Sequence, residues 1–199
     1  MSKLFLYGAG GHAKVVAEIA ELNGYEHIVF CEDEPTKDKL LGYEVVAILE
    51  EDGSCLIAIG NNAVRKKLAQ SLSNRFVQLV HPQTNLSPRS NIGEGTVVMA
   101  GVTINADATV GEHCIINTNA SVDHDCVIED YVHLSPNVAL AGNVTIGEGT
   151  HIGIGACVIQ GVKVGRWCTV GAGAVVIRDV PDGATVVGNP ARNIKQKEL

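Results

Sequence analysis

The chain has 199 residues, of which 46% are hydrophobic and 19% are charged, and its formal net charge is −7 at pH 7. This length allows one large domain or two small ones with real cores. The acidic balance argues against a nucleic-acid-binding surface. No apolar run approaches the ~20 residues that span a bilayer, and residues 4–7 are too few for a signal-peptide core, so we expect a cytoplasmic protein without a membrane anchor.

The N-terminal stretch predicts a strand, a glycine turn, a helix and a second strand. Residues 3–7 are apolar and run into the sequence Gly-Ala-Gly-Gly-His at 8–12. Residues 13–23 have the apolar spacing of a helix, which Gly24 ends. The second strand, over residues 27–31, is followed directly by Glu32 and Asp33.

This turn has the chemistry of a phosphate site. Glycines let a ligand approach the backbone, and the free amides at a helix start favour phosphate oxygens. A carboxylate after the next strand can accept hydrogen bonds from ribose hydroxyls. A purely structural tight turn is the alternative, and a nicotinamide dinucleotide site is disfavoured because the half-domain ends near residue 80.

The next elements complete a Rossmann-like α/β half-domain. A third strand over residues 55–59 ends at Gly60, beside the first turn, where open α/β sheets bind ligands. A helix over residues 63–73 and a last strand over residues 76–80 follow. Pro82 marks the expected boundary, which predicts an α/β domain at 1–80 and a second domain at 81–199.

The second domain has a repeat of six residues. Every sixth residue from Leu86 to Val176 is Leu, Ile or Val. One short strand and one turn per hexad, with three hexads per coil of 18 residues, fit this period, and successive coils would stack as parallel strands roughly 4.8 Å apart. The fourth residue after each such rung is small or β-branched, as a narrow interior requires. Glycine commonly follows the rung, where we expect the corner to need an unusual φ.

The six cysteines include no CxxC pair, so we expect no metal site. Three of them, Cys114, Cys126 and Cys168, fall on the small inward positions of the repeat. We therefore interpret them as buried thiols in a reducing compartment.

Four motifs together resemble one family of hexapeptide-repeat acetyltransferases. They are Gly8-Ala-Gly-Gly-His-Ala-Lys14, Ala58-Ile-Gly-Asn-Asn62, Asn117-Thr118 and Val122-Asp-His-Asp-Cys126. The family acts on nucleotide-linked 4-amino sugars of the bacillosamine and perosamine type, and on sialic acids. The resemblance implies a left-handed parallel β-helix, a homotrimer and acetyl-CoA as the acetyl donor.

Acetyl transfer needs a base, a donor for the oxyanion and a site that holds both substrates. His124 is the predicted base, since an imidazole titrates near neutrality. The resemblance implies that Asp125 orients and activates it, with Asp123 as the competing partner. Gly142 lies one coil from His124 and leaves its backbone open to the acyl donor.

The resemblance further implies that the backbone at Gly142, Ile154 and Ala172 contacts acetyl-CoA, and that His133 hydrogen-bonds the thioester carbonyl. Nine residues separate His124 from His133, so the two face different directions, and we expect the active site to lie between subunits. Asn117 is a predicted substrate contact, although stacked amides can also be structural. The roles of His151 and Arg192 stay open.

The sequence thus predicts acetyl-CoA-dependent N-acetylation of the 4-amino group of a UDP-linked 4-amino-4,6-dideoxy sugar for surface glycans. Gly10, Gly11 and Gly60 would approach the nucleotide, His12 the phosphates, and Glu32 or Asp33 the nucleoside. The alternatives are O-acetylation of sialic acid, N-acetylation of GDP-perosamine, and a β-helical scaffold without chemistry.

Overall fold

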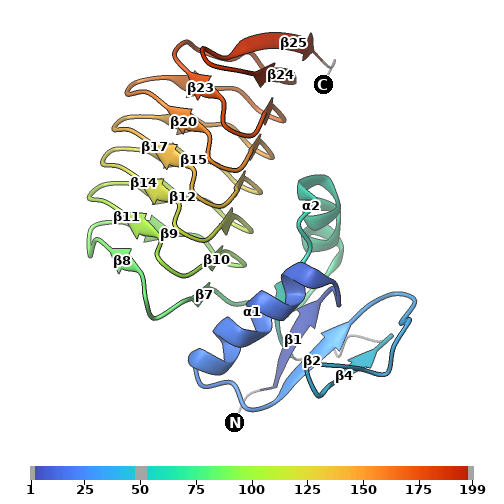
Figure 1. Cartoon of the computed structure of the whole chain (residues 1–199). Helices are drawn as coiled ribbons and strands as arrows, with labels where there is room; N and C mark the ends of the chain where they lie inside the picture. The colour runs from blue at the N-terminus through green and yellow to red at the C-terminus, as the bar shows by residue number, and fades with distance from the viewer. Residues whose placement is uncertain (1–2, 48–52, 197–199) are drawn as a thin grey trace.

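The computed structural model describes residues 3–47 and 53–196. It contains an N-terminal α/β domain followed by a three-sided coil of short parallel strands (Figure 1). The second helix of the α/β domain stands alongside the coil. Neither helix in these two ranges combines the length and the apolar character that crossing a bilayer requires.

The α/β domain has a mostly parallel sheet in the order β3-β4-β2-β1-β5-β6, in which only β3 runs antiparallel to its neighbour. Its elements are β1 (Leu4–Tyr7), α1 (Gly11–Leu22), β2 (Ile28–Cys31), β3 (Lys39–Leu40), β4 (Tyr43–Val46), β5 (Ser54–Ile57), α2 (Asn62–Ser71) and β6 (Arg75–Phe76). Helix α1 buries one face, including Ala13, Val16 and Ala20, as its apolar spacing predicts.

Two parts of this domain differ from the prediction. The strand expected over residues 76–80 is divided: β6 completes the α/β sheet, whereas β7 (Leu79–Val80) pairs with the coil. Val80 lies six residues before Leu86, so the apolar repeat begins one step earlier than we predicted. The β3–β4 hairpin was not predicted; its turn at Leu41 and Gly42 has positive φ at both residues (51° and 87°), as tight hairpin turns prefer.

The coil has three faces of parallel two-residue strands. Face 1 contains β7, β10 (Val97–Val98), β13 (Ile115–Ile116), β16 (His133–Leu134), β19 (His151–Ile152) and β22 (Thr169–Val170), and ends with β24 (Ala184–Val187) and β25 (Arg192–Gln196). Face 2 contains β8 (Asn85–Leu86), β11 (Thr103–Ile104), β14 (Ser121–Val122), β17 (Ala139–Leu140), β20 (Cys157–Val158) and β23 (Val175–Val176). Face 3 contains β9 (Asn91–Ile92), β12 (Thr109–Val110), β15 (Val127–Ile128), β18 (Thr145–Ile146) and β21 (Lys163–Val164). We call the turns that follow faces 1, 2 and 3 corners 1, 2 and 3.

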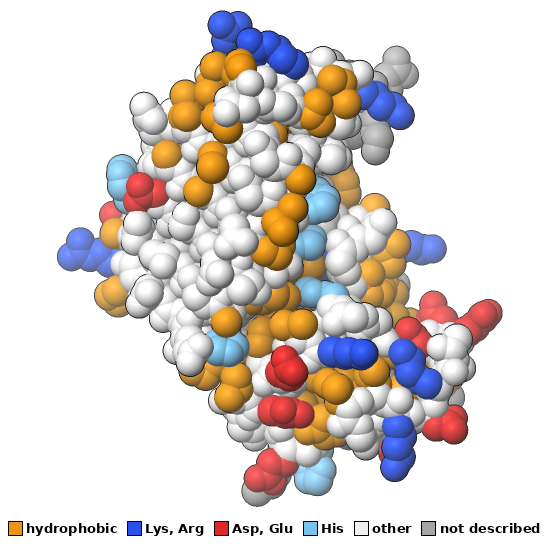
Figure 2. All heavy atoms as spheres, viewed as in Figure 1, with side chains coloured by type: hydrophobic (Ala, Val, Ile, Leu, Met, Phe, Trp, Pro, Cys, Tyr) orange, Lys and Arg blue, Asp and Glu red, His pale blue; other side chains and the backbone are white. Residues whose placement is uncertain are grey.

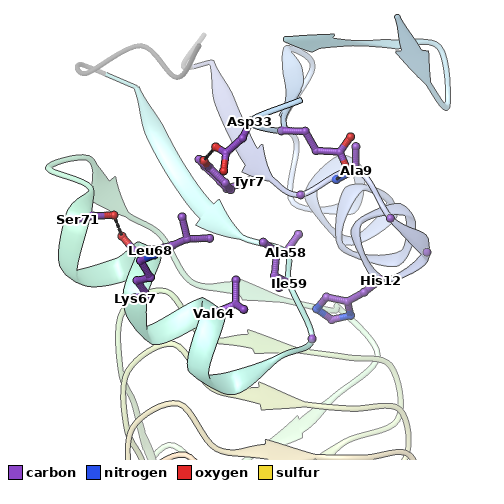
Figure 3. Close-up of a pocket in the computed structure, with 15 residues that line it drawn as sticks. Tyr7, Ala9, His12, Asp33, Ala58, Ile59, Val64, Lys67, Leu68 and Ser71 are labelled. Carbon is purple, nitrogen blue, oxygen red and sulfur yellow. Dashed lines mark hydrogen bonds between the residues drawn. The ribbon is translucent and has the colours of Figure 1, made fainter. Parts of the chain in front are cut away.

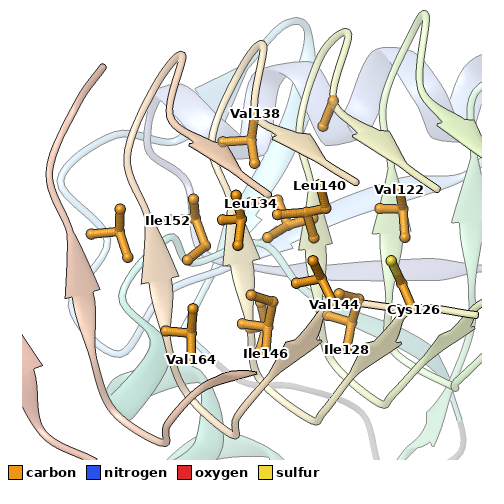
Figure 4. Packing of buried hydrophobic residues seen from close by; sticks show 14 of the residues in the cluster. Val122, Cys126, Ile128, Leu134, Val138, Leu140, Val144, Ile146, Ile152 and Val164 are labelled. Atoms are coloured by element: carbon orange, nitrogen blue, oxygen red, sulfur yellow. The ribbon is translucent and has the colours of Figure 1, made fainter. Parts of the chain in front are cut away.

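The register confirms the coil of 18 residues. Val98 pairs with Ile116 on face 1, Ile104 with Val122 on face 2 and Val110 with Ile128 on face 3. The rungs and the small residues four positions later form one buried core along the axis (Figure 4). Burial of each Val, Leu or Ile rung contributes about 1.5–3 kcal/mol, and neighbouring coils supply the contacts.

After every rung from Ile92 to Val170, the corner turns at a residue with positive φ, three positions after the rung. Asn119 (φ 58°) and Asp125 (φ 59°) are examples. The glycines that directly follow the rungs do not have this φ, which corrects our expectation. A Cβ on Gly93 would lie 2.5 Å from the carbonyl carbon of Gly111, so glycine there allows two successive corners to pack closely.

The C-terminal end closes the coil with a shorter turn. Val170 pairs with Val186, 16 positions later, because the repeat stops at Asp182. Strand β25 then folds back antiparallel on β24 at the end of face 1. The change from parallel to antiparallel pairing ends the stacking of coils at this hairpin.

Candidate active site

A cavity of about 710 Å³ opens at the carboxyl ends of β1 and β5 (Figure 3). It contains all six residues that the sequence predicted for the nucleotide: Gly10, Gly11, His12, Glu32, Asp33 and Gly60. Tyr7, Val64, Lys67, Leu68 and Ser71 also line it and were not predicted. Four of these five lie on α2, whose position over the strand ends is a property of the tertiary structure.

The glycine turn has two distinct functions. A Cβ on Gly8, where φ is 116°, would lie 2.9 Å from the carbonyl oxygen of Ala58, so this glycine is needed for packing against β5. A Cβ on Gly10 or Gly11 would meet nothing within 4 Å. Helix α1 has no side-chain cap, whereas Asn61 caps α2 by accepting from the amide of Val64. The first turn of α1 thus has no side-chain cap and has open space at its glycines, which suits the binding of an anion.

The acidic end of the cavity is held in place by hydrogen bonds. The Tyr7 hydroxyl donates to Asp33, and the amide of Ala9 donates to Glu32 Oε1 at 3.3 Å. Burial and the neighbouring Asp33 carboxylate raise the pKa of Tyr7, so the phenol stays protonated and remains the donor. Two carboxylates therefore present acceptors to whatever part of a ligand lies here.

His12 points from the start of α1 toward the segment at Ile59 (Figure 3). Its Nε2 atom is buried and has no hydrogen-bond partner within residues 3–47 and 53–196. Burial, and secondly the charge of Arg65, lower the pKa of His12 to about 4, so the ring is neutral at pH 7. A neutral imidazole can still donate one hydrogen bond to a phosphate oxygen.

His124 and Asp125 form a pair at corner 2. His124 Nδ1 lies 2.7 Å from Asp125 Oδ2, and both side chains are about 60% exposed. Adjacent side chains diverge on a flat strand, but the positive φ of Asp125 turns its carboxylate back to the ring. Asp125, and secondly the charge of Asp123, raise the pKa of His124.

Asp123, the competing partner, is occupied elsewhere. Its Oδ1 accepts from Asn105 Nδ2 at 2.8 Å and from the backbone amide of His124 at 2.8 Å. These hydrogen bonds, the one from Asn105 first, lower the pKa of Asp123, so it is a carboxylate at neutral pH. Asp125 therefore orients the imidazole, while Asp123 anchors the corner that carries it.

Gly142 lies under the His124 ring. A Cβ there would be 2.6 Å from Cε1 and 2.7 Å from Nε2 of His124. With Nδ1 bonded to Asp125, Nε2 is the atom free to take a proton, and it lies above bare backbone. The ring thus occupies the space that a side chain at position 142 would fill, so glycine at this position makes room for the imidazole.

His133 and Asn117 lie toward the α/β domain. Asn117 Nδ2 is 3.2 Å from His133 Nε2, and the His133 ring stacks on His151 with centroids 4.9 Å apart. His133 also has a hydrogen bond with the backbone of Gly60, on the wall of the cavity. Burial, followed by the charge of His151, lowers the pKa of His133 to about 3. Figure 2 shows histidine side chains along this junction between the two domains.

The predicted acetyl-CoA contacts lie on two edges of the coil. Ile154 and Ala172 are exposed at corner 1, on successive coils that are joined by a 2.8 Å hydrogen bond from Gly173 N to Ile154 O. Gly142 is at corner 2 with His124, so one chain does not bring the three positions onto one edge. The Arg192 side chain is exposed, and its Nη1 donates to the carbonyl of the neighbouring Ala191 at 3.1 Å.

No group of three or more His, Cys, Asp or Glu side chains in the described ranges could hold a metal ion. Five of the six cysteines are buried, including Cys114, Cys126 and Cys168. Burial raises the pKa of each of these three thiols, which makes them poor nucleophiles.

Two family models match the chain. The PglD N-terminal domain matches residues 3–72, and the bacterial transferase hexapeptide repeat matches residues 89–124 and 143–178. A UDP-N-acetylbacillosamine N-acetyltransferase of Bacillus subtilis is 44% identical over 113 residues, which cover 50% of this chain and 52% of that enzyme. The chain spans about half or less of the length of the curated relatives it matches.

Solved structures match over nearly the whole chain. The acetyltransferase domain of PglB from Neisseria gonorrhoeae is 41% identical with a TM-score of 0.93, and the match covers 98% of this chain and all of that one. The same domain has been solved with acetyl coenzyme A. A mutant perosamine N-acetyltransferase of Caulobacter crescentus, in complex with CoA and GDP-perosamine, is 39% identical with a TM-score of 0.92, over 98% of each chain.

The matches to the two solved enzymes extend over both domains of the chain, the α/β domain and the left-handed parallel β-helix that follows it. The chain therefore belongs to the family of hexapeptide-repeat sugar N-acetyltransferases that carry a PglD N-terminal domain.

Proposed function

We propose that the protein transfers an acetyl group from acetyl-CoA to the 4-amino group of a UDP-linked 4-amino-4,6-dideoxy sugar. The observation that carries the proposal is the bond of 2.7 Å between His124 Nδ1 and Asp125, which leaves Nε2 free above Gly142. A base that is held in one tautomer by a carboxylate, on a side chain that is about 60% exposed, suits proton removal from an attacking amine.

In the proposed reaction His124 Nε2 accepts a proton from the 4-amino group as its nitrogen attacks the thioester carbonyl. The C–N bond forms and the C–S bond breaks; the proton held by His124 then passes to the departing sulfur, so that CoA leaves as the thiol and the imidazole is neutral again. Asp125 stabilises the imidazolium that results, consistent with its effect on the pKa of His124. No acetylated enzyme side chain is needed, because the amine is itself the nucleophile.

The nucleotide is proposed to bind in the cavity of the α/β domain. The uncapped start of α1 faces its diphosphate, and Glu32 and Asp33 face the nucleoside. The cavity is lined entirely by residues of the α/β domain, whereas His124 belongs to corner 2 of the coil. We therefore propose that the active site forms between two subunits of a homotrimer, with His124 from one subunit and the cavity, His133 and Asn117 from another.

Thermal unfolding with UDP, GDP and CMP tests the nucleotide, because a ligand that binds only the folded state at 100 times its Kd stabilises it by about 2.7 kcal/mol. We expect UDP to raise the Tm most. A larger shift with GDP would favour GDP-perosamine, the sugar bound in the Caulobacter crescentus structure. A larger shift with CMP would direct attention to sialic acid and O-acetylation.

Transfer is tested by thiol release from acetyl-CoA with UDP-linked 4-amino sugars, comparing the wild type with His124→Ala. We expect the variant to lose at least ~100-fold in kcat, the usual contribution of a general base. Equal rates would remove His124 from the mechanism. Absence of release by the wild type with every amino-sugar nucleotide would favour the scaffold alternative.

A further inference from the structure

Arg65 is the largest of the fully buried side chains, although it carries a charge. It lies in the second turn of α2 and is 1% exposed. Burial lowers its pKa to about 10, so the guanidinium remains a cation at neutral pH. Arginine is almost never fully buried unless its donors are paired, so the burial of Arg65 depends on the hydrogen bonds that its guanidinium makes.

The four hydrogen bonds of Arg65 divide equally between the two domains. Within the α/β domain Nη1 donates to Ile59 O at 2.9 Å and Nη2 donates to Asn62 Oδ1 at 2.8 Å. Toward the coil Nε donates to His113 O at 2.7 Å and Nη2 donates to Tyr131 O at 2.8 Å. The rigid fork of the guanidinium thus joins both domains at once, which a Lys ammonium cannot do with the same geometry.

The acceptors on the coil form a regular row. His113 and Tyr131 are 18 residues apart at corner 3, and Gly149, one coil further on, accepts from Asn62 Nδ2 at 2.9 Å. All three have positive φ. At the positive-φ position of this corner, the backbone amide bonds the carbonyl one residue before the corresponding position of the preceding coil, for example Tyr131 N to Glu112 O at 2.9 Å. The carbonyls in the row are thus available to side chains.

This row is next to the proposed acceptor cavity. Ile59 and Asn62 flank Gly60, which lines the cavity and bonds His133 of face 1. Arg65 and Asn62 together therefore fix the segment 59–62 relative to three successive coils. A shift of the α/β domain by part of a coil, or a tilt away from corner 3, would break the two bonds of Arg65 to the coil and leave part of a buried charge unpaired.

We propose that Arg65 is a positioning residue for acetyl transfer: its guanidinium sets the height and tilt of the nucleotide-sugar cavity on the coil, so that the acceptor amine reaches the acetyl group. This inference rests on the proposed function. Misplacement of a reacting group by about 1 Å can cost 100-fold in rate. Arg65 does not line the cavity, so its loss should affect the rate more than the binding of either substrate.

The test compares Arg65→Lys with Arg75→Lys, an exposed arginine on β6. For Arg65→Lys we expect kcat to fall about 10- to 100-fold, while KM for acetyl-CoA and the Tm shift caused by UDP stay near the wild-type values. Arg75→Lys should match the wild type. If Arg65→Lys retains wild-type kcat, or loses only substrate binding, the inference is wrong.

Asn62→Ala provides a second variant should Arg65→Lys not fold, since it removes one partner of Arg65 and the bond to Gly149. It should lower kcat with the same pattern, and unchanged kcat would contradict the inference. Hydrogen exchange separates this result from failure of the proposed function. Even if the wild type acetylates no amino sugar, peptides covering residues 59–65 should exchange faster in either variant than in Arg75→Lys, and equal exchange would overturn the positioning role.

Discussion

Gly142→Ala tests the geometry of the proposed base directly. The added methyl carbon would lie 2.6 Å from Cε1 and 2.7 Å from Nε2 of His124, whereas carbon atoms pack at about 3.5–4.0 Å. The backbone of Gly142 does not have positive φ, so alanine fits the chain itself. The exposed ring must retreat by about 1 Å, which strains or breaks its bond to Asp125.

We expect this retreat to lower kcat about 100-fold, or ~2.7 kcal/mol of transition-state stabilisation. The Tm should change little, because the His124 side chain is about 60% exposed and few contacts are lost. Steady-state thiol release and thermal unfolding measure the two quantities.

A double-mutant cycle gives the control. In a His124→Ala background the methyl group has no ring to displace, so Gly142→Ala should cause no further loss of kcat. An equal loss in both backgrounds, with a raised KM for acetyl-CoA, would show that Gly142 acts through the acyl donor. A wild-type kcat for the single variant would refute the placement of the base.

Two further predictions concern titrating groups. Asp125→Asn should lower the pKa of His124, because the carboxylate that raises it is lost. In the pH profile of kcat/KM, the acidic limb should therefore move to lower pH and the plateau should fall. An unchanged pH profile would exclude the pair from catalysis. Burial, and secondly the charge of Arg65, lower the pKa of His113 to about 4, below the ~6.5 of a histidine in the unfolded chain. Between pH 6.5 and 4 the unfolded chain therefore binds the proton and the folded protein does not. The free energy of unfolding should fall over this range as the pH drops, by up to ~1.4 kcal/mol per pH unit. The variant His113→Asn should lose less stability over this pH range, measured by melting curves at several pH values; asparagine is chosen because it tolerates the positive φ of this position. His27→Asn, at an exposed histidine, serves as the control and should behave as the wild type does. Parallel slopes for the wild type and both variants would contradict the role given to His113.

The sequence predicted much of the candidate site because several of its parts are local. Glycine turns, an acidic residue after a strand, and a histidine beside an aspartate are short-range patterns, and the residues Gly10, His12 and Glu32 do meet in one cavity. Tyr7 and Ser71 were missed, because a strand end and a helix face become part of a pocket only when the elements pack. No sequence pattern predicted the role of Arg65, because a single charged residue in a helix is expected to be exposed to solvent.

The repeat of six residues by itself determined the coil, because a period that matches one strand and one turn decides which side chains point inward in every coil. It did not locate the positive φ of the corners, since Asn, Asp, His, Trp and Gly all occupy that position. The tertiary structure alone decided how the α/β domain sits on the coil. That arrangement depends on a few hydrogen bonds to backbone carbonyls, and backbone carbonyls are the same for every residue, so no pattern of side chains in the sequence records them.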